Sequence, residues 1–111
     1  MRESIAIILL LILLPFLQTI AQTEPTIDSG DWVINDTTVI ENKIINLTGN
    51  LTVNGELKFE NVTLNMNLSF EGEYGIFVNA GGKLYIYNST ITALNTSNRY
   101  HFKVYSGSFF E

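Results

Sequence analysis

Apolar and polar residues alternate with a period of two over most of the chain after residue 31. The alternation is clearest in five short runs, at residues 51–53, 57–59, 76–78, 84–86 and 102–104. A period of two is typical of strands that bury one face, and Val, Ile, Thr, Tyr and Phe, which strands prefer, dominate these runs. Gly, Asn and Ser separate the runs, and no helical period follows residue 21. The pattern therefore predicts an all-β domain.

One phrase of this pattern occurs twice and begins a third time. Residues 55–65 read GELKFENVTLN and residues 82–92 read GKLYIYNSTIT, so the copies lie 27 residues apart (82 minus 55). The phrase starts again at Gly107 as GSFFE, and a fainter copy at residues 40–45 precedes the first at an offset of 19. Repetition at about 20–50 residues indicates stacked structural units. We expect equivalent apolar residues of successive units to lie on one another: Leu57 with Leu84, Phe59 with Ile86, and Leu64 with Ile91.

The recurrent asparagine of the phrase has a physical explanation in such a stack. A bend between two strands needs a residue with positive φ, and Asn tolerates this conformation better than any residue except Gly. Its side-chain amide can also bond the Asn of the next unit, so we expect an inward-facing structural ladder of Asn42, Asn61 and Asn88. Asn54-Gly55 is alternatively a hairpin signal. A hairpin predicts an isolated strand pair, whereas a fixed unit follows Gly55, and we favour the stack.

From Asp31 onward the chain resembles the right-handed parallel β-helix family, which includes pectate-lyase-like folds and their relatives in secreted and cell-surface proteins. The resemblance rests on GNLTVNGELKFENVTL at residues 49–64 and GIFVNAGGKLYIYNSTI at residues 75–91. It implies a right-handed parallel β-helix of about three incomplete coils over residues 31–111. Since the third phrase stops without a polar cap, we expect the start of a longer β-helix, truncated at its C-terminal end. Further coils or another copy would then cover that end.

The N-terminal residues predict export. Residues 5–14 form an unbroken apolar run, and Pro15 and a small-residue triplet at 19–21 follow it. A bilayer span needs about 20 apolar residues, so the shorter run indicates a helical signal peptide over residues 1–21, followed by a linker over residues 22–30. The alternative is an uncleaved anchor, which would be the chain's one route to a membrane. The expected location is secreted or cell surface.

Charge and composition limit the partners. The net charge of −5 argues against nucleic acid and anionic membrane surfaces, and the lack of Cys excludes disulfides as the stabilising device. Seven Asn residues lie in Asn-x-Ser/Thr triplets, which in an exported protein can accept N-linked sugar, although the abundance of Asn and Thr also produces such triplets by chance. With two of the seven assigned to the ladder, the glycosylation candidates are Asn35, Asn46, Asn50, Asn67 and Asn95.

Residues suited to catalysis are sparse. Glu41 and Glu60 each precede a ladder Asn and could hold a cation between them, but Tyr87 occupies the third equivalent position and ends the row. His101 is the single histidine, with no Cys or second His to complete an ordinary metal site. The sequence therefore predicts no catalytic residue, no metal site and no cofactor.

Two tyrosines suggest a binding function. Tyr85 and Tyr87 are expected to point outward from one strand, where they could stack on sugar rings or simply cover the sheet. We expect an exported, glycosylated, structural or adhesive module of a cell-surface or extracellular protein, and not an enzyme. Two alternatives stay open. One is the N-terminal part of a polysaccharide lyase or glycosidase-like enzyme whose catalytic coils lie beyond residue 111, and the other is a sugar-binding module.

Overall fold

The structure is a computed structural model that describes residues 30–111, and this part of the chain consists of strands and loops without a helix. The strands are β1 (Trp32–Ile34), β2 (Thr37–Leu47), β3 (Leu51–Val53), β4 (Glu56–Met66), β5 (Gly75–Val78), β6 (Lys83–Tyr87), β7 (Thr90–Ala93), β8 (His101–Val104) and β9 (Phe109–Phe110). The predicted all-β class is confirmed. The predicted signal helix at 1–21 and the linker up to residue 29 lie outside the described residues.

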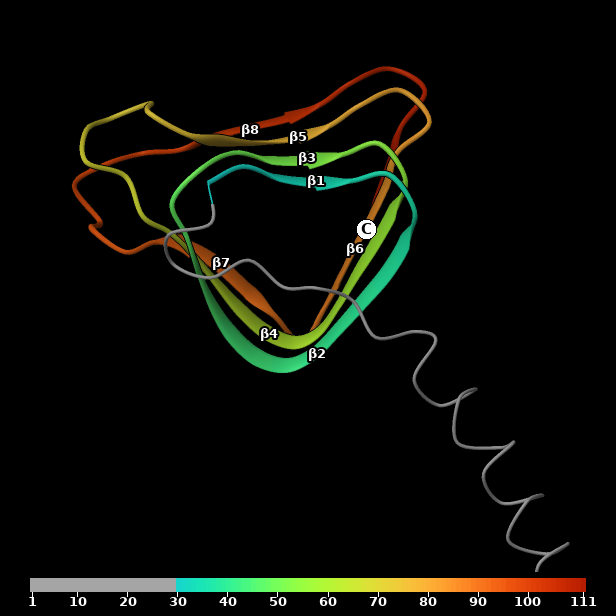
Figure 1. Cartoon of the computed structure of the whole chain (residues 1–111), viewed down its shortest axis with the longest axis horizontal. Helices are drawn as coiled ribbons and strands as arrows, with labels where there is room; N and C mark the ends of the chain where they lie inside the picture. The colour runs from blue at the N-terminus through green and yellow to red at the C-terminus, as the bar shows by residue number, and fades with distance from the viewer. Residues whose placement is uncertain (1–29) are drawn as a thin grey trace, which may run out of the picture.

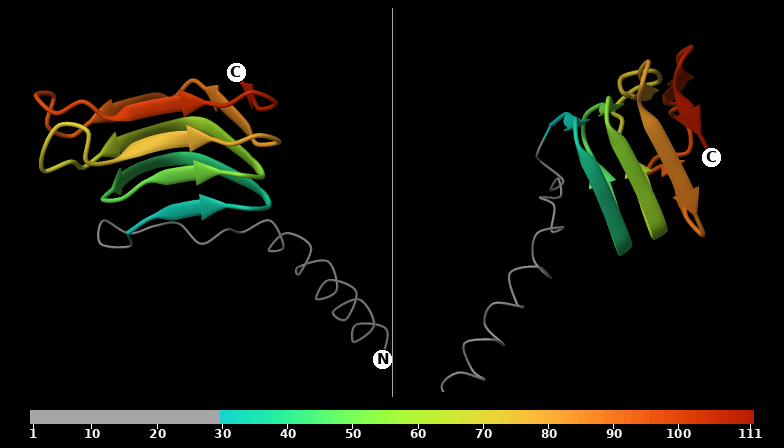
Figure 2. Two further views of the ribbon diagram at one scale, coloured as in Figure 1. Left: turned by 90° about the horizontal axis from the view of Figure 1, so that it is seen from above. Right: turned by 90° about the vertical axis from the view of Figure 1, so that its right-hand side faces the viewer.

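Two parallel sheets make up the fold. One sheet has the order β1-β3-β5-β8 and the other the order β2-β4-β6-β9, with β7 also paired to β4. Apart from β6 and β7, which both belong to the second sheet, successive strands alternate between the sheets, so the chain forms four stacked layers (Figures 1 and 2). We call these layers one (β1 and β2), two (β3 and β4), three (β5 to β7) and four (β8 and β9). The hairpin alternative at Asn54-Gly55 is wrong, because β3 and β4 lie in different sheets and every strand pair is parallel.

The register of the sheets follows the repeat. Leu57 is the Cα partner of Leu84, Phe59 of Ile86, and Leu64 of Ile91, as the repeated phrase predicts. Layers one and two are offset by 19 residues at Asn35 and Asn54, whereas the next step is 25 residues at Asn54 and Asn79. The additional residues lie mainly in the loop between β4 and β5.

The hydrophobic core lies between the two sheets. In β4 the inward side chains of Leu57, Phe59, Leu64 and Met66 are fully buried. The ring of Phe59 lies 6.1 Å from that of Trp32, which joins β1 to the centre of the opposite sheet. Within residues 30–111 no buried side-chain nitrogen or oxygen lacks a hydrogen-bond partner. Burial of apolar side chains in stacked rows is therefore the main stabilising contribution of a domain without disulfides.

Candidate functional site

The corner asparagines have the predicted backbone conformation. Asn42, Asn61 and Asn88 have φ values of 56°, 56° and 48°, and they are the non-glycine residues with positive φ in the described range. Figure 1 shows that β2 and β4 each bend midway. Asn42 and Asn61 lie in the middle parts of these two strands, and Asn88 lies between β6 and β7 in the next layer. Left-handed geometry at one non-glycine residue thus turns each of layers one to three within the second sheet.

The ladder itself differs from the expectation at its third rung. Asn61 Nδ2 donates a hydrogen bond of 2.8 Å to Asn42 Oδ1, but Asn88 Nδ2 donates to Glu60 Oε1 at 3.2 Å instead of bonding Asn61. The expected inward orientation is wrong, because Asn42, Asn61 and Asn88 are all exposed. They lie at an outer corner, where a positive φ rather than burial decides the residue type.

A longer ladder occurs at a corner that the repeated phrase does not contain. Asn54 Nδ2 donates to Asn35 Oδ1 at 2.9 Å, and Asn79 Nδ2 donates to Asn54 Oδ1 at 2.7 Å. A fourth pair joins Asn65 Nδ2 to Asn46 Oδ1 at 2.9 Å. The sequence signal for the first of these ladders is an Asn directly after each of the runs 32–34, 51–53 and 76–78.

The structure separates the glycosylation candidates by the accessibility of their amides. The amide nitrogen, which carries the sugar, is used by Asn67 in a 3.0 Å bond to Thr48 Oγ1. Asn46 and Asn50 are half-buried, and Asn50 Oδ1 accepts a hydrogen bond from the Gly75 backbone N–H. Asn35 and Asn95 are exposed, and their Oδ1 atoms accept hydrogen bonds from Asn54 Nδ2 and the Ser97 backbone N–H, respectively. Asn35 and Asn95 are therefore the most accessible acceptors.

No arrangement for metal chemistry is found in the described part of the chain. Glu41 and Glu60 are Cα partners in β2 and β4, but no group of three or more His, Cys, Asp or Glu residues that could hold a metal ion occurs among residues 30–111. Glu60 instead accepts the amide hydrogen bond from Asn88. His101 begins β8 in the first sheet, away from this glutamate pair.

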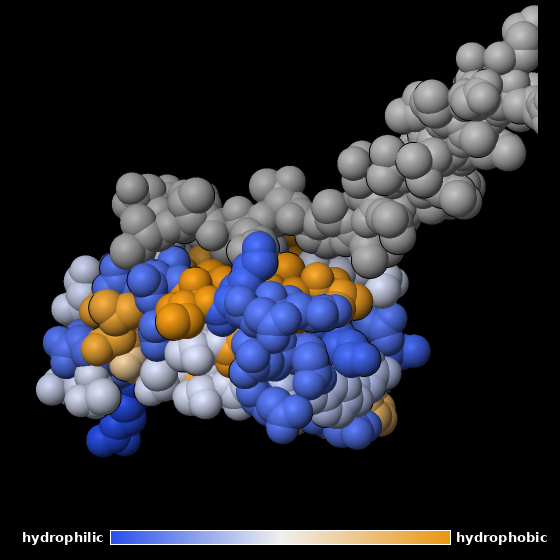
Figure 3. All heavy atoms as spheres, turned by 90° about the horizontal axis from the view of Figure 1, so that it is seen from below, coloured by the Kyte–Doolittle hydropathy of each residue, from blue (hydrophilic) through white to orange (hydrophobic). Residues whose placement is uncertain are grey.

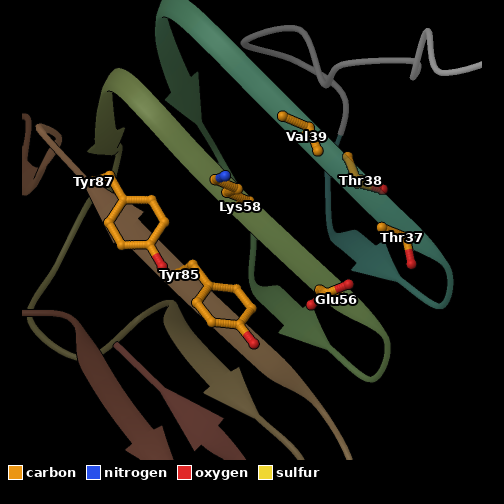
Figure 4. A pocket seen from close by; sticks show the side chains of 7 residues that line it. All are labelled: Thr37, Thr38, Val39, Glu56, Lys58, Tyr85 and Tyr87. Atoms are coloured by element: carbon orange, nitrogen blue, oxygen red, sulfur yellow. The ribbon is translucent and has the colours of Figure 1, made fainter.

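A hollow lies on the outer face of the second sheet. Figure 4 shows Tyr85 and Tyr87 on β6 beside Glu56 and Lys58 on β4, with residues of β2 beyond them. The hollow has a volume of about 200 Å³. The two rings lie side by side with centroids 6.1 Å apart and planes 28° apart. Its lining residues are Thr37, Thr38, Val39, Glu56, Lys58, Tyr85 and Tyr87.

The electrostatic surroundings of the two tyrosines are mixed. Lys58 Nζ lies 5.3 Å from the centroid of the Tyr87 ring, within cation–π range. Desolvation raises the pKa of Tyr87 above its ordinary value, and the nearby Glu111 carboxylate raises it further by charge repulsion and by a hydrogen bond to the phenol. The phenol is therefore protonated, and can donate, throughout the neutral pH range.

The outer surface around the bends of β2 and β4 is largely hydrophilic, with apolar side chains gathered along one side (Figure 3). Exposed apolar residues of the first layer include Val33, Val39 and Ile44. Layer four, at the opposite end of the stack, carries a second set that includes Phe102, Val104 and Phe110. The apolar surface is thus concentrated where the stack of layers ends.

Comparisons of the chain with protein-family models, curated proteins and solved structures find no match. Within residues 30–111 no helix is long and apolar enough to cross a membrane. The functional argument therefore rests on the geometry of the sheets and of the outer hollow.

Proposed function

We propose that this chain is an exported, glycosylated structural module of a cell-surface or extracellular protein, built as a right-handed parallel β-helix. The support for the fold is that the chain passes repeatedly between two all-parallel sheets, with the repeated phrases in register. Right-handed connections are the rule for parallel strands, which favours that hand. The support for export is the N-terminal sequence, and for glycosylation the exposed Asn-x-Ser/Thr triplets.

One observation carries the structural role: the inward positions of layer four are not covered. Ile76 and Val78 in layer three are fully buried, whereas their Cα partners Phe102 and Val104 in layer four are 36% and 45% exposed. Phe102 and Val104 continue an apolar row of the core, and their side chains are of the large apolar kind that the layers beneath bury. The row is therefore suited to contact one more layer of the same kind.

The backbone of layer four supports the same conclusion. In their sheets β8 pairs only with β5, and β9 only with β6, so one side of each strand is an open edge in the described stack. An open edge pairs readily with an additional strand, and natural proteins usually protect such edges with charge, proline or a covering segment. We infer that layer four binds another strand layer, supplied by a further coil or by a second copy.

Edge variants test this role in the exported protein. We expect the wild type to self-associate in sedimentation velocity, and the Val104→Lys/Phe110→Lys double variant to be mainly monomeric, because charge at an edge opposes strand addition. Phe70→Lys is the matched control, since Phe70 is 60% exposed in the loop between β4 and β5 and lies outside the layer-four strands. A wild type that stays monomeric at every concentration, or equal loss of association in the control, contradicts the proposal.

A further inference from the structure

We propose that the outer hollow at Tyr85 and Tyr87 binds part of a neutral, hydroxyl-rich saccharide chain. This inference is independent of the proposed structural role, because it concerns the outer face of the second sheet and not its open edge. Three features of the hollow carry it: an aromatic platform, flanking groups that both donate and accept hydrogen bonds, and a local balance of charge.

The platform is formed by neighbouring outward positions of one strand. Tyr85 and Tyr87 are two residues apart on β6, and Figure 4 shows both rings leaning the same way with their broad faces in view. Their centroid separation of 6.1 Å is comparable to the length of one hexose unit in a chain. The apolar C–H face of a pyranose ring packs on an aromatic face, so two such rings offer places for adjacent sugar units.

Neighbouring side chains hold the platform in place. The Tyr85 ring lies 5.3 Å from that of Phe109 on β9, and Lys58 Nζ lies 5.3 Å from the Tyr87 ring. The Glu111 carboxylate acts on the Tyr87 phenol closely enough to raise its pKa. Both tyrosines are half-buried rather than freely exposed. A ring already held in its binding orientation loses little conformational entropy when a ligand packs on it.

The polar lining matches sugar hydroxyls. Glu56 accepts hydrogen bonds, Lys58 donates them, and the Thr37 hydroxyl can do both. A sugar hydroxyl is also both a donor and an acceptor, so these groups can be satisfied together. Specific sites typically combine aromatic walls with a few polar groups in this way.

Charge selects the class of saccharide. Lys58 and Glu56 contribute opposite charges to the lining, so the hollow has no net cationic character. Glu60 and Glu111 lie close enough to Tyr87 to act on its phenol, and the chain carries a net charge of −5. A uronate would meet this acidic field without a compensating cluster of cations, which favours a neutral chain.

The size of the hollow sets the expected affinity. Its volume of about 200 Å³ is below the range of about 300–1,000 Å³ typical of ligand cavities. It therefore covers only part of an oligosaccharide, and the remaining units extend along the open face. We expect a dissociation constant of about 1 mM for a hexasaccharide, which corresponds to a few hydrogen bonds and two stacked rings.

Saturation-transfer NMR tests the inference, because it observes the sugar protons and tolerates a self-associated protein. The probes are cellohexaose and N-acetylchitohexaose as neutral chains and trigalacturonate as an anionic chain. We expect saturation transfer to at least one neutral hexasaccharide and weaker transfer to trigalacturonate. Failure of both neutral probes to bind, or stronger binding of trigalacturonate, overturns the proposal, whereas the edge variants decide the structural role separately.

Variants locate the bound sugar. Tyr87→Ala should weaken binding at least about fivefold by removing half of the platform, and Tyr87→Phe, which keeps the ring, should stay within about twofold of wild type. Tyr105→Ala is the control, because Tyr105 is an exposed tyrosine outside the hollow. Retained binding in Tyr87→Ala, or an equal loss in Tyr105→Ala, contradicts the site. Where Tyr87→Ala folds poorly, Tyr85→Ala removes the other ring of the platform and should weaken binding to a similar extent; unchanged binding in Tyr85→Ala contradicts the site.

Discussion

Asn42, Asn61 and Asn88 are placed at outer corners by their backbone conformation. The side-chain amides of Asn61 and Asn88 then donate to whichever acceptor the layer below offers. For Asn61 the acceptor is another asparagine, and for Asn88 it is the carboxylate of Glu60. The positive φ is common to all three residues, while the ladder is not. At the scale of single residues, backbone geometry is therefore the stronger constraint at these corners.

Substitutions at Asn61 separate the contribution of the positive φ from that of the side-chain hydrogen bond. Asn61→Gly keeps the allowed backbone conformation and loses the 2.8 Å bond to Asn42, so we expect a loss of about 0.5–1.5 kcal/mol in the free energy of unfolding. Asn61→Ala should cost about 1 kcal/mol more, because alanine is strained at φ 56°. Urea denaturation measures both values. An alanine variant more stable than the glycine variant would show that φ is not the main constraint.

The partly buried phenol of Tyr100 leads us to expect a loss of stability at alkaline pH. Burial raises its pKa above the ordinary value of 10.0, and its hydroxyl donates a 3.1 Å hydrogen bond to the Ile91 carbonyl. The folded state therefore holds the phenolic proton longer than the unfolded state, and stability falls as the pH rises through 10.0 toward the raised value. Tyr100→Phe should lower stability at pH 8 but reduce its fall between pH 8 and pH 11. An unchanged pH dependence in this variant contradicts the assignment.

Between elements, the layers approach most closely at glycines of the corner turns. A Cβ at Gly82 would lie 2.2 Å from the carbonyl oxygen of Val53 in the layer below. Gly55, which holds the equivalent place one layer earlier, would put a Cβ 2.3 Å from the Asp36 carbonyl oxygen. The glycine of the repeated phrase is thus required by contact between layers, because any side chain there would push the strands apart.

Neighbouring glycines provide a test at the scale of elements. Gly82→Ala should cost about 3 kcal/mol or more, since its Cβ meets backbone that cannot move without separating β3 from its partner layer. Gly81→Ala is the control: no atom lies within 4 Å of its Cβ, and its φ of +84° alone costs about 1 kcal/mol. Equal destabilisation in the two variants, measured by thermal and urea unfolding, would contradict the close-contact argument.

One column of inward side chains predicts a gradient of stability along the stack. Leu57, Leu84 and Phe110 are consecutive Cα partners, and the first two are fully buried while Phe110 is 47% exposed. Leu57→Ala should therefore cost about 2–5 kcal/mol. Phe110→Ala should cost less than about 1.5 kcal/mol, because much of that ring is already in solvent. A larger loss for Phe110→Ala would mean that layer four, rather than layer two, anchors the core.

At the scale of the whole molecule, the four layers share one core but differ in how well they cover it. Layer two buries its inward row almost completely, layer three leaves Ile86 and Ile91 only partly buried, and the inward side chains of layer four are largely exposed. The open edge and the outer hollow face different directions, so association and sugar binding can be measured independently.

Export and modification can be checked on the whole protein. We expect the mature chain to begin at Gln22. In a host that attaches N-linked sugar, we expect glycan to occupy Asn35 and Asn95 before Asn61 and Asn88, because the amide nitrogens of Asn61 and Asn88 are hydrogen-bonded. N-terminal sequencing and glycopeptide mass spectrometry measure both outcomes. An intact N-terminus would favour the anchor alternative, and full occupancy of Asn61 would contradict the order of accessibility.

The sequence by itself determined the period of the strands, the parallel register and the corner residues. The reason is that these features repeat: a period of two marks the buried face, and Leu57 aligned with Leu84 fixes the register. The recurrent Asn likewise identified the positions of positive φ.

Only the tertiary structure decided which neighbours each repeated residue meets. The asparagine of the third unit bonds Glu60, and the corner asparagines face solvent, because side-chain partners depend on the layer below and not on the residue's own phrase. The hollow at Tyr85 could also be found only from the tertiary structure, because its lining comes from three strands of three different layers. A periodic sequence defines what each layer repeats, while differences between layers become visible only when the layers are stacked.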